Sequence, residues 1–140
     1  MKNFLYLSLF ALMAACAGRR LQAQVVVIAN PSVKAAEATK SDLKDVFTGA
    51  GSSLKDGSHV VPVLLKDGTA NDEFLTAYIG KSDAAFRASW RSLVFSGQAS
   101  MPKSVDSEAA MVEYVAHTPG AVGYIGKATP HEGVKVITAK

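Results

Sequence analysis

The chain has 140 residues, which is enough for one domain with one hydrophobic core. Its 15 Lys and Arg residues against 12 Asp and Glu residues give a net charge of +3. Three of the basic residues, Lys2, Arg19 and Arg20, lie in an N-terminal stretch that has no acidic residue. The rest of the chain is therefore neutral, and the absence of a basic stripe argues against a nucleic-acid partner.

An apolar, uncharged run follows Lys2 and covers residues 4–17. This run is too short to span a bilayer comfortably and has the length of a signal-peptide core. Cleavage after Ala23 would remove residues 1–23 as a signal peptide and leave residues 24–140 as the mature domain. We therefore expect an exported protein, located in the periplasm or secreted.

Cys16 supports an alternative to plain secretion. It ends the segment "MAAC", which resembles a bacterial lipoprotein processing site, and lipidation of Cys16 would anchor the protein to a membrane. Either form leaves a mature domain without a disulfide. His59, His117 and His131 lie far apart without metal-ligand spacing, so no metal is expected. No nucleophile–base or cofactor-binding motif is present, so we expect neither a cofactor nor an enzyme.

The mature segment predicts a single α/β domain, because predicted strands alternate with predicted helices. Residues 25–30, "VVVIAN", form a continuous β-branched run, which is typical of a strand buried on both faces, as in a parallel sheet. A second strand is predicted at residues 59–65, where Pro62 should lie near an edge or a bulge because it cannot donate a ladder hydrogen bond. Two further short strands are predicted at residues 121–125 and 134–138.

Four helices are predicted from apolar periodicity and from capping residues. The first is capped by Ser41 and ended by Gly49 and Gly51, and the second ends at Gly80. The third follows Ser82 over residues 83–95, and the fourth covers residues 108–117.

One face of the third predicted helix is apolar, and this face should join the core. A ligand platform at Trp90 is the alternative to a core position. Arg87 and Arg91 lie on the other side of the helix and are expected to face solvent. The large side chains expected to be buried around the sheet are Phe47, Phe74, Trp90, Val94 and Tyr124.

The stretch "KDGTANDEF", residues 66–74, joins the second predicted strand to the second predicted helix. Anions bind at such joints, because free backbone N–H groups and the positive end of the helix dipole meet there. Residues 68–71 are predicted to form the first helical turn, with Thr69 or Asn71 as its cap. A capped helix start that binds no ligand is the alternative interpretation.

The segment "HTPGAVGYIG", residues 117–126, resembles the "TPGAIGYV" signature of the periplasmic phosphate-binding proteins of ABC transporters. Three upstream segments are similar to parts of the same family in the same order: "SDLKDVFTG" at 41–49, "DGSHVVPV" at 56–63 and "ASWRSLVFSGQASMPKSV" at 88–105. The resemblance covers nearly all of residues 25–126. It implies a single lobe of a type 2 periplasmic-binding-protein-like fold, with a mostly parallel sheet flanked by helices.

The resemblance also implies a ligand site at the joint. The family's loop reads roughly "DGSGTxxxF" after an arginine; here Gly68 and Thr69 keep the Gly–hydroxyl pair, and Lys66 stands in place of the arginine. Lysine cannot offer the bidentate fork of arginine, and Asp67 would repel an anion at close range. In the anion-binding interpretation, Lys66 would supply charge, Thr69 and Asn71 would donate hydrogen bonds, and Gly68 and Ala70 would present backbone N–H groups.

We therefore expect an exported solute-binding-like protein that holds phosphate or another small oxyanion weakly at a helix N-terminus. The alternative is a periplasmic protein-interaction module that derives from the same lobe and binds no ligand. The implied partners are the oxyanion and a membrane transporter or another envelope protein. A homo-oligomer is possible, because a second chain could cover the open site.

Overall fold

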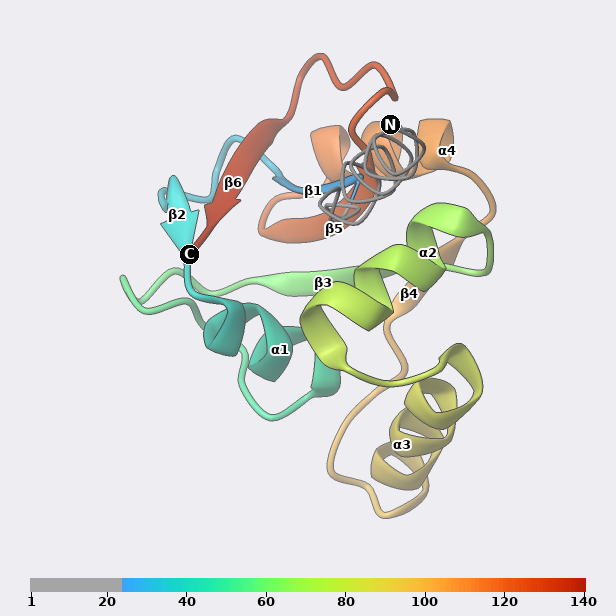
Figure 1. Cartoon of the computed structure of the whole chain (residues 1–140). Helices are drawn as coiled ribbons and strands as arrows, with labels where there is room; N and C mark the ends of the chain where they lie inside the picture. Colours follow the sequence, from blue (N-terminus) through green and yellow to red (C-terminus); the bar gives the residue numbers. More distant parts are fainter. Residues whose placement is uncertain (1–23) are drawn as a thin grey trace, which may run out of the picture.

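The computed structural model describes residues 24–140, so the predicted signal peptide and the alternative lipidation of Cys16 lie outside the described residues. Figure 1 shows one sheet with helices packed around it. No helix in the described part of the chain is long and apolar enough to cross a bilayer. The elements are β1 (Val25–Ala29), β2 (Glu37–Ala38), α1 (Lys40–Thr48), β3 (Val61–Leu65), α2 (Thr69–Phe74), its π-helical continuation η1 (Leu75–Ile79), α3 (Asp83–Phe95), β4 (Lys103–Val105), α4 (Glu108–His117), β5 (Ala121–Gly126) and β6 (Lys135–Ala139).

The six strands form one sheet in the order β2-β6-β1-β5-β3-β4. β3 runs parallel to β4 and β5, and β2 runs parallel to β6, which confirms the prediction of a mostly parallel sheet. β1 is antiparallel to both of its neighbours, so the expectation that it lies among parallel strands was wrong. Its continuous apolar run reflects a central position covered on both faces, and such burial does not depend on strand direction.

Pro62 lies where one side of β3 is open. The N–H of Val61 donates to the carbonyl of Gly120, on the side of β5. The nitrogen of the next residue, Pro62, therefore faces away from β5, and β4 pairs with β3 only from Val63 onward. The missing donor of Pro62 thus costs no ladder hydrogen bond, as predicted for an edge position.

Helix capping follows the prediction at α3 but not at α1. Ser82 accepts a hydrogen bond from the N–H of Ala85 and caps α3, as expected. α1 starts earlier than predicted, because the cap is Thr39, whose hydroxyl accepts from the N–H of Asp42. Ser41 lies inside the helix as a consequence, and the predicted cap at Ser41 was wrong.

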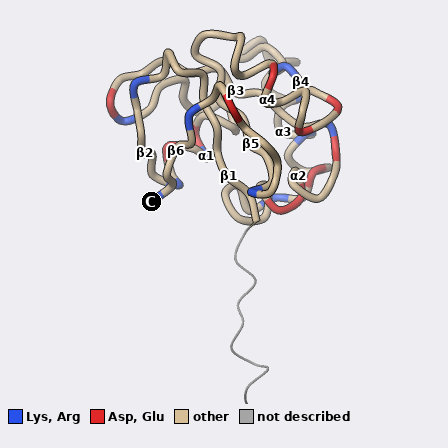
Figure 2. Tube along the Cα trace, turned by 90° about the horizontal axis from the view of Figure 1, so that it is seen from above, with Lys and Arg blue, Asp and Glu red and all other residues tan. Residues whose placement is uncertain are grey.

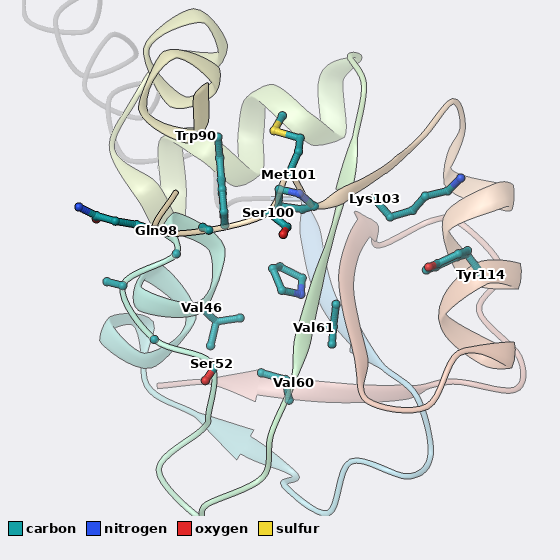
Figure 3. Close-up of a pocket in the computed structure, with 16 residues that line it drawn as sticks. Val46, Ser52, Val60, Val61, Trp90, Gln98, Ser100, Met101, Lys103 and Tyr114 are labelled. Atoms are coloured by element: carbon teal, nitrogen blue, oxygen red, sulfur yellow. The ribbon is translucent and has the colours of Figure 1, made fainter. Parts of the chain in front are cut away.

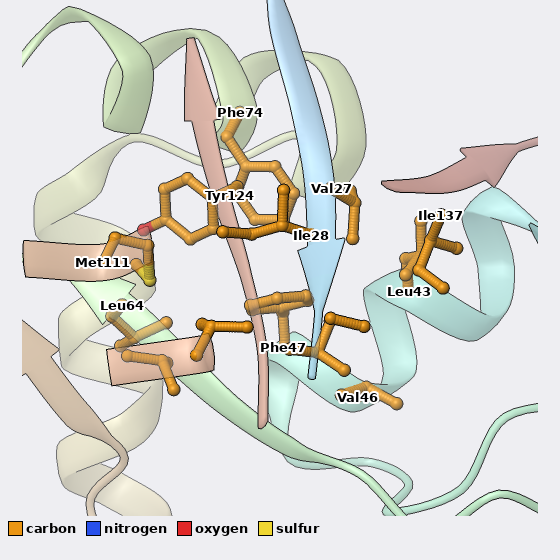
Figure 4. Close-up of a cluster of buried hydrophobic side chains, with 14 of the residues drawn as sticks. Val27, Ile28, Leu43, Val46, Phe47, Leu64, Phe74, Met111, Tyr124 and Ile137 are labelled. Carbon is orange, nitrogen blue, oxygen red and sulfur yellow. The ribbon is translucent and has the colours of Figure 1, made fainter. Parts of the chain in front are cut away.

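Three aromatic rings form the centre of the core between the sheet and the helices (Figure 4). Phe74 stacks on Tyr124 with ring centroids 3.9 Å apart, and Phe47 meets Phe74 edge-on at 4.9 Å. Trp90 is also buried, and its indole N–H donates to the carbonyl of Phe47 at 3.0 Å. These contacts confirm four of the five predicted core positions and favour a core role for Trp90.

Val94 was wrongly placed in the core, because its side chain is 41% exposed. The buried residues of α3 are Phe86 and Trp90, and the last turn of the helix contributes no buried residue. Figure 1 shows α3 and the loop after it at one extremity of the fold, away from the sheet. The apolar periodicity of the helix continues to Val94, but the hydrophobic core ends before this residue.

Candidate functional site at the joint between β3 and α2

The joint between β3 and α2 is a short exposed turn. Gly68 is the N-cap of α2 and has φ 100° and ψ 171°. This positive φ favours glycine, because a side chain would be strained there. No side chain caps the helix, so the prediction that Thr69 or Asn71 is the cap was wrong. Lys66, Asp67, Gly68 and Thr69 are all exposed.

Asn71 is not a cap because its side chain points into the core. Its Oδ1 accepts a hydrogen bond from the Tyr124 hydroxyl at 2.6 Å, and its Nδ2 donates to Asp83 at 2.8 Å. The Tyr124 oxygen also accepts from the N–H of Leu65, the last residue of β3, at 3.0 Å. Burial raises the pKa of Tyr124 to about 12, so this hydroxyl stays protonated and can donate. This network connects the end of β3 to the first turn of α2 on the buried side of the joint.

Arg87 reaches the joint from α3, so the expectation that it faces solvent was wrong. Its Nε lies 3.0 Å from both oxygens of Asp83, one helical turn earlier. Its Nη2 donates to the carbonyls of Leu65 and Lys66, each at 2.8 Å. The guanidinium therefore connects α3 to the end of β3 through hydrogen bonds. The i, i+4 spacing of Asp83 and Arg87 is visible in the sequence, but it does not reveal that the arginine contacts another element.

The first turn of α2 contains backbone donors that lack a protein partner; Gly68 and Thr69 are exposed, whereas Ala70 and Asn71 are buried. Within the described chain, the N–H groups of Gly68, Thr69, Ala70 and Asn71 donate to no protein acceptor, and neither does the Thr69 hydroxyl. The first N–H groups of a helix have no intrahelical partner, so such a turn can accept an anion. The structure thus brings the predicted backbone donors together, but the side-chain amide of Asn71 is already occupied.

Both cationic side chains of the joint, Lys66 and Arg87, form ion pairs with carboxylates. Lys66 pairs with Asp106 at 2.8 Å, and both side chains are exposed. The hydrogen bond and positive charge of Lys66 lower the pKa of Asp106 from its ordinary value. Two cationic and five acidic side chains lie in or beside the joint: Lys66, Asp67, Asp72, Glu73, Asp83, Arg87 and Asp106. This local excess of negative charge opposes strong binding of an anion.

The fold matches solved structures of phosphate-binding proteins. A candidate phosphate ABC transporter substrate-binding protein with bound phosphate from Clostridium perfringens matches with a TM-score of 0.63 and 17% identity, over 83% of this chain and 44% of that chain. An ABC-type phosphate transport receptor from Vibrio cholerae matches with a TM-score of 0.55 and 17% identity, over 83% of this chain and 46% of that chain. A candidate phosphate-binding protein from Planctomyces limnophilus matches with a TM-score of 0.56 and 17% identity, over 84% and 41%.

These matches confirm the predicted fold class, an α/β fold like part of a periplasmic phosphate-binding protein. The chain spans less than half of the length of the structures that it matches. No family model and no curated protein matches it. The described residues contain no cluster of three or more His, Cys, Asp or Glu side chains that could hold a metal ion.

Proposed function

We propose that this chain is an exported solute-binding-like protein that holds phosphate or another small oxyanion weakly at the joint between β3 and α2. The observation that carries the proposal is the row of free N–H groups at residues 68–71, on a fold shared with phosphate-binding proteins. The bound phosphate of the Clostridium perfringens structure supports the choice of anion. An envelope transporter is the corresponding protein partner, and no enzymatic activity is proposed.

Each residue at the joint has a distinct part in this proposal. Gly68, Ala70 and Asn71 offer backbone N–H groups, and Thr69 adds a hydroxyl. Lys66 supplies a positive charge at the exposed rim of the joint. The side chain of Asn71 positions the turn through Tyr124 and does not touch the ligand.

Binding at this joint should be weak. An exposed anion remains in water, where salt screens each contact, and the nearby carboxylates oppose it. We expect a dissociation constant on the order of millimolar, which corresponds to a binding free energy of about 4 kcal/mol in magnitude. Since Asp106 neutralises Lys66, removing the carboxylate should strengthen binding, whereas removing the lysine should weaken it.

Calorimetry of residues 24–140 against phosphate, sulfate and acetate, at low and high salt, tests the proposal. Asp106→Asn should tighten phosphate binding and Lys66→Gln should weaken it, each by about threefold to tenfold. Lys127→Gln, which removes an exposed charge that pairs with no carboxylate in the described chain, is the matched control and should change nothing. Absence of binding to all three anions, or equal effects of Lys66→Gln and Lys127→Gln, would contradict a site at this joint.

A further inference from the structure

The end of α3 and the loop after it expose several large apolar side chains. Phe95 is 96% exposed, which is unusual for a phenylalanine, and Val94 and Met101 are 41% and 45% exposed. Together with Arg91 these residues line one shallow hollow, and we call Arg91, Val94, Phe95 and Met101 the α3-tip patch. Contiguous apolar surface of this kind marks an interaction site more often than isolated exposed side chains do.

The patch continues into a cleft beside the open end of β3. This cleft has a volume of about 630 Å³, and Met101 lines both it and the patch. Figure 3 shows Val61 from β3, Tyr114 from α4 and Lys103 at the start of β4 around the cleft. Val61 is itself 45% exposed. Four of the five large apolar side chains exposed in the described chain therefore line either the patch or the adjoining cleft.

The charge of this region is opposite to that of the rest of the described chain. Residues 84–105 contain Arg87, Arg91 and Lys103 and no acidic residue. The other described residues contain nine basic and twelve acidic residues, and Figure 2 marks these positions along the trace. Arg91 and Lys103 form no ion pair within the described chain. Arg91 is exposed, and Lys103 Nζ lies over the Tyr114 ring, 5.8 Å from its centroid.

We infer that the α3-tip patch docks on an anionic lipid surface. Phe95 and Met101 would enter the boundary between headgroups and acyl chains, while Arg91 and Lys103 would contact lipid phosphates. Apolar side chains at a protruding end, flanked by basic residues, have the composition of an interfacial anchor. The position of α3 at an extremity of the fold allows the patch to meet a flat surface (Figure 1).

A second copy of this chain fits the patch less well than a lipid surface does. A symmetric dimer through the patch would bring both copies of Arg91 into one small interface, since the same surface is used twice. Like charges at an interface oppose association, whereas an anionic bilayer attracts both arginines. The charge of the patch therefore favours lipid as its occupant.

Vesicle sedimentation tests this inference, using the predicted mature protein, residues 24–140. Vesicles of phosphatidylglycerol mixed with phosphatidylcholine should bind the protein, and pure phosphatidylcholine should bind it much more weakly. Phe95→Ser should lower the partition coefficient about tenfold or more, and Arg91→Gln about fivefold. Both changes are at exposed positions and should leave the melting temperature unchanged.

Val136→Ser is the matched control, because Val136 is 42% exposed on β6 and lies outside the patch. It should bind vesicles as the unchanged protein does. A Phe95→Trp variant should also show a blue-shifted emission and quenching by brominated lipid, whereas the buried Trp90 should not respond. Equal binding of Phe95→Ser and Val136→Ser, no binding to anionic vesicles, or a dimer that Phe95→Ser dissociates would each overturn the inference.

Discussion

The hydroxyl of Tyr124 on β5 donates to Oδ1 of Asn71 on α2 across 2.6 Å, and so connects the sheet to the helix beneath the candidate site. The same oxygen accepts from the N–H of Leu65 at the end of β3. One buried hydroxyl therefore fixes both sides of the joint. The geometry of the exposed turn thus depends on a residue more than 50 positions away in the chain.

Tyr124→Phe should lower the free energy of unfolding by about 1–3 kcal/mol, because it leaves the buried N–H of Leu65 and Oδ1 of Asn71 without their partner. Urea denaturation measures the change. Tyr114→Phe is the control, since the Tyr114 hydroxyl makes no hydrogen bond in the described structure. A Tyr124→Phe variant as stable as Tyr114→Phe would show that the network contributes nothing.

The stability of the protein should fall at alkaline pH because of the same tyrosine. Burial raises the pKa of Tyr124 to about 12, from 10.0 for a free tyrosine. Below pH 10 the phenol is protonated in both states and its stabilisation is complete. Between pH 10 and 12 the unfolded chain loses this proton first, so the free energy of unfolding decreases, by on the order of 2–3 kcal/mol in all.

Unfolding by urea at a series of pH values from 8 to 12 measures this decrease. Tyr124→Phe should show a shallower decline than the unchanged protein, because the titrating group is gone. Parallel curves for the two proteins would mean that Tyr124 does not titrate differently in the folded and unfolded states.

The C-terminal ends of two helices and the N-terminal cap of α3 were predicted correctly from single residues. Gly49 and Gly80 end their helices in the left-handed conformation, as their residue type indicates, and Ser82 caps α3. These signals are local, since the backbone preference or the side-chain oxygen acts within one turn. The resemblance to phosphate-binding proteins added the fold class, which the solved structures confirm.

The contacts at the candidate site could not be predicted, because they join distant segments. Asparagine is a common N-cap residue, but the side chain of Asn71 points inward, where its Oδ1 accepts a hydrogen bond from the Tyr124 hydroxyl. Arg87 follows the polar face of α3, yet that face meets the carbonyls at the end of β3. The direction of β1 was missed for a similar reason, since an apolar run indicates burial and not the direction of its neighbours.

Gly49→Ala should destabilise the protein more than Gly57→Ala, although both glycines have φ above 80°. A Cβ at Gly49 would lie 2.9 Å from Leu93 Cδ1 and 3.0 Å from the Trp90 ring, whereas a Cβ at Gly57 would meet nothing within 4 Å. Both variants carry the backbone strain, of about 1 kcal/mol, and only Gly49→Ala adds a clash of about 1–3 kcal/mol. Equal melting temperatures for the two variants would mean that α1 and α3 can separate at no cost.

Arg87→Ala should cost about 1–3 kcal/mol of stability, because Asp83 and two carbonyl groups lose a partly buried donor. Arg91→Ala, at an exposed position one turn later, should stay within about 0.5 kcal/mol. Denaturant titrations of both variants measure the difference. Arg87→Lys should recover only part of the loss, since lysine lacks the fork that serves Asp83 and β3 together. Full recovery would show that charge alone is sufficient.

The most direct test of oxyanion binding at the joint is a phosphate titration of ¹⁵N-labelled protein, residues 24–140, followed by amide chemical shifts. We expect the shifts of Gly68, Thr69, Ala70 and Asn71 to move most and to saturate with a millimolar dissociation constant. Chloride at the same ionic strength is the control and should not reproduce these changes. Shifts that stay unchanged at residues 68–71 at tens of millimolar phosphate, or that move instead around the cleft lined by Ser32, His59 and Gly120, would contradict a site at this joint.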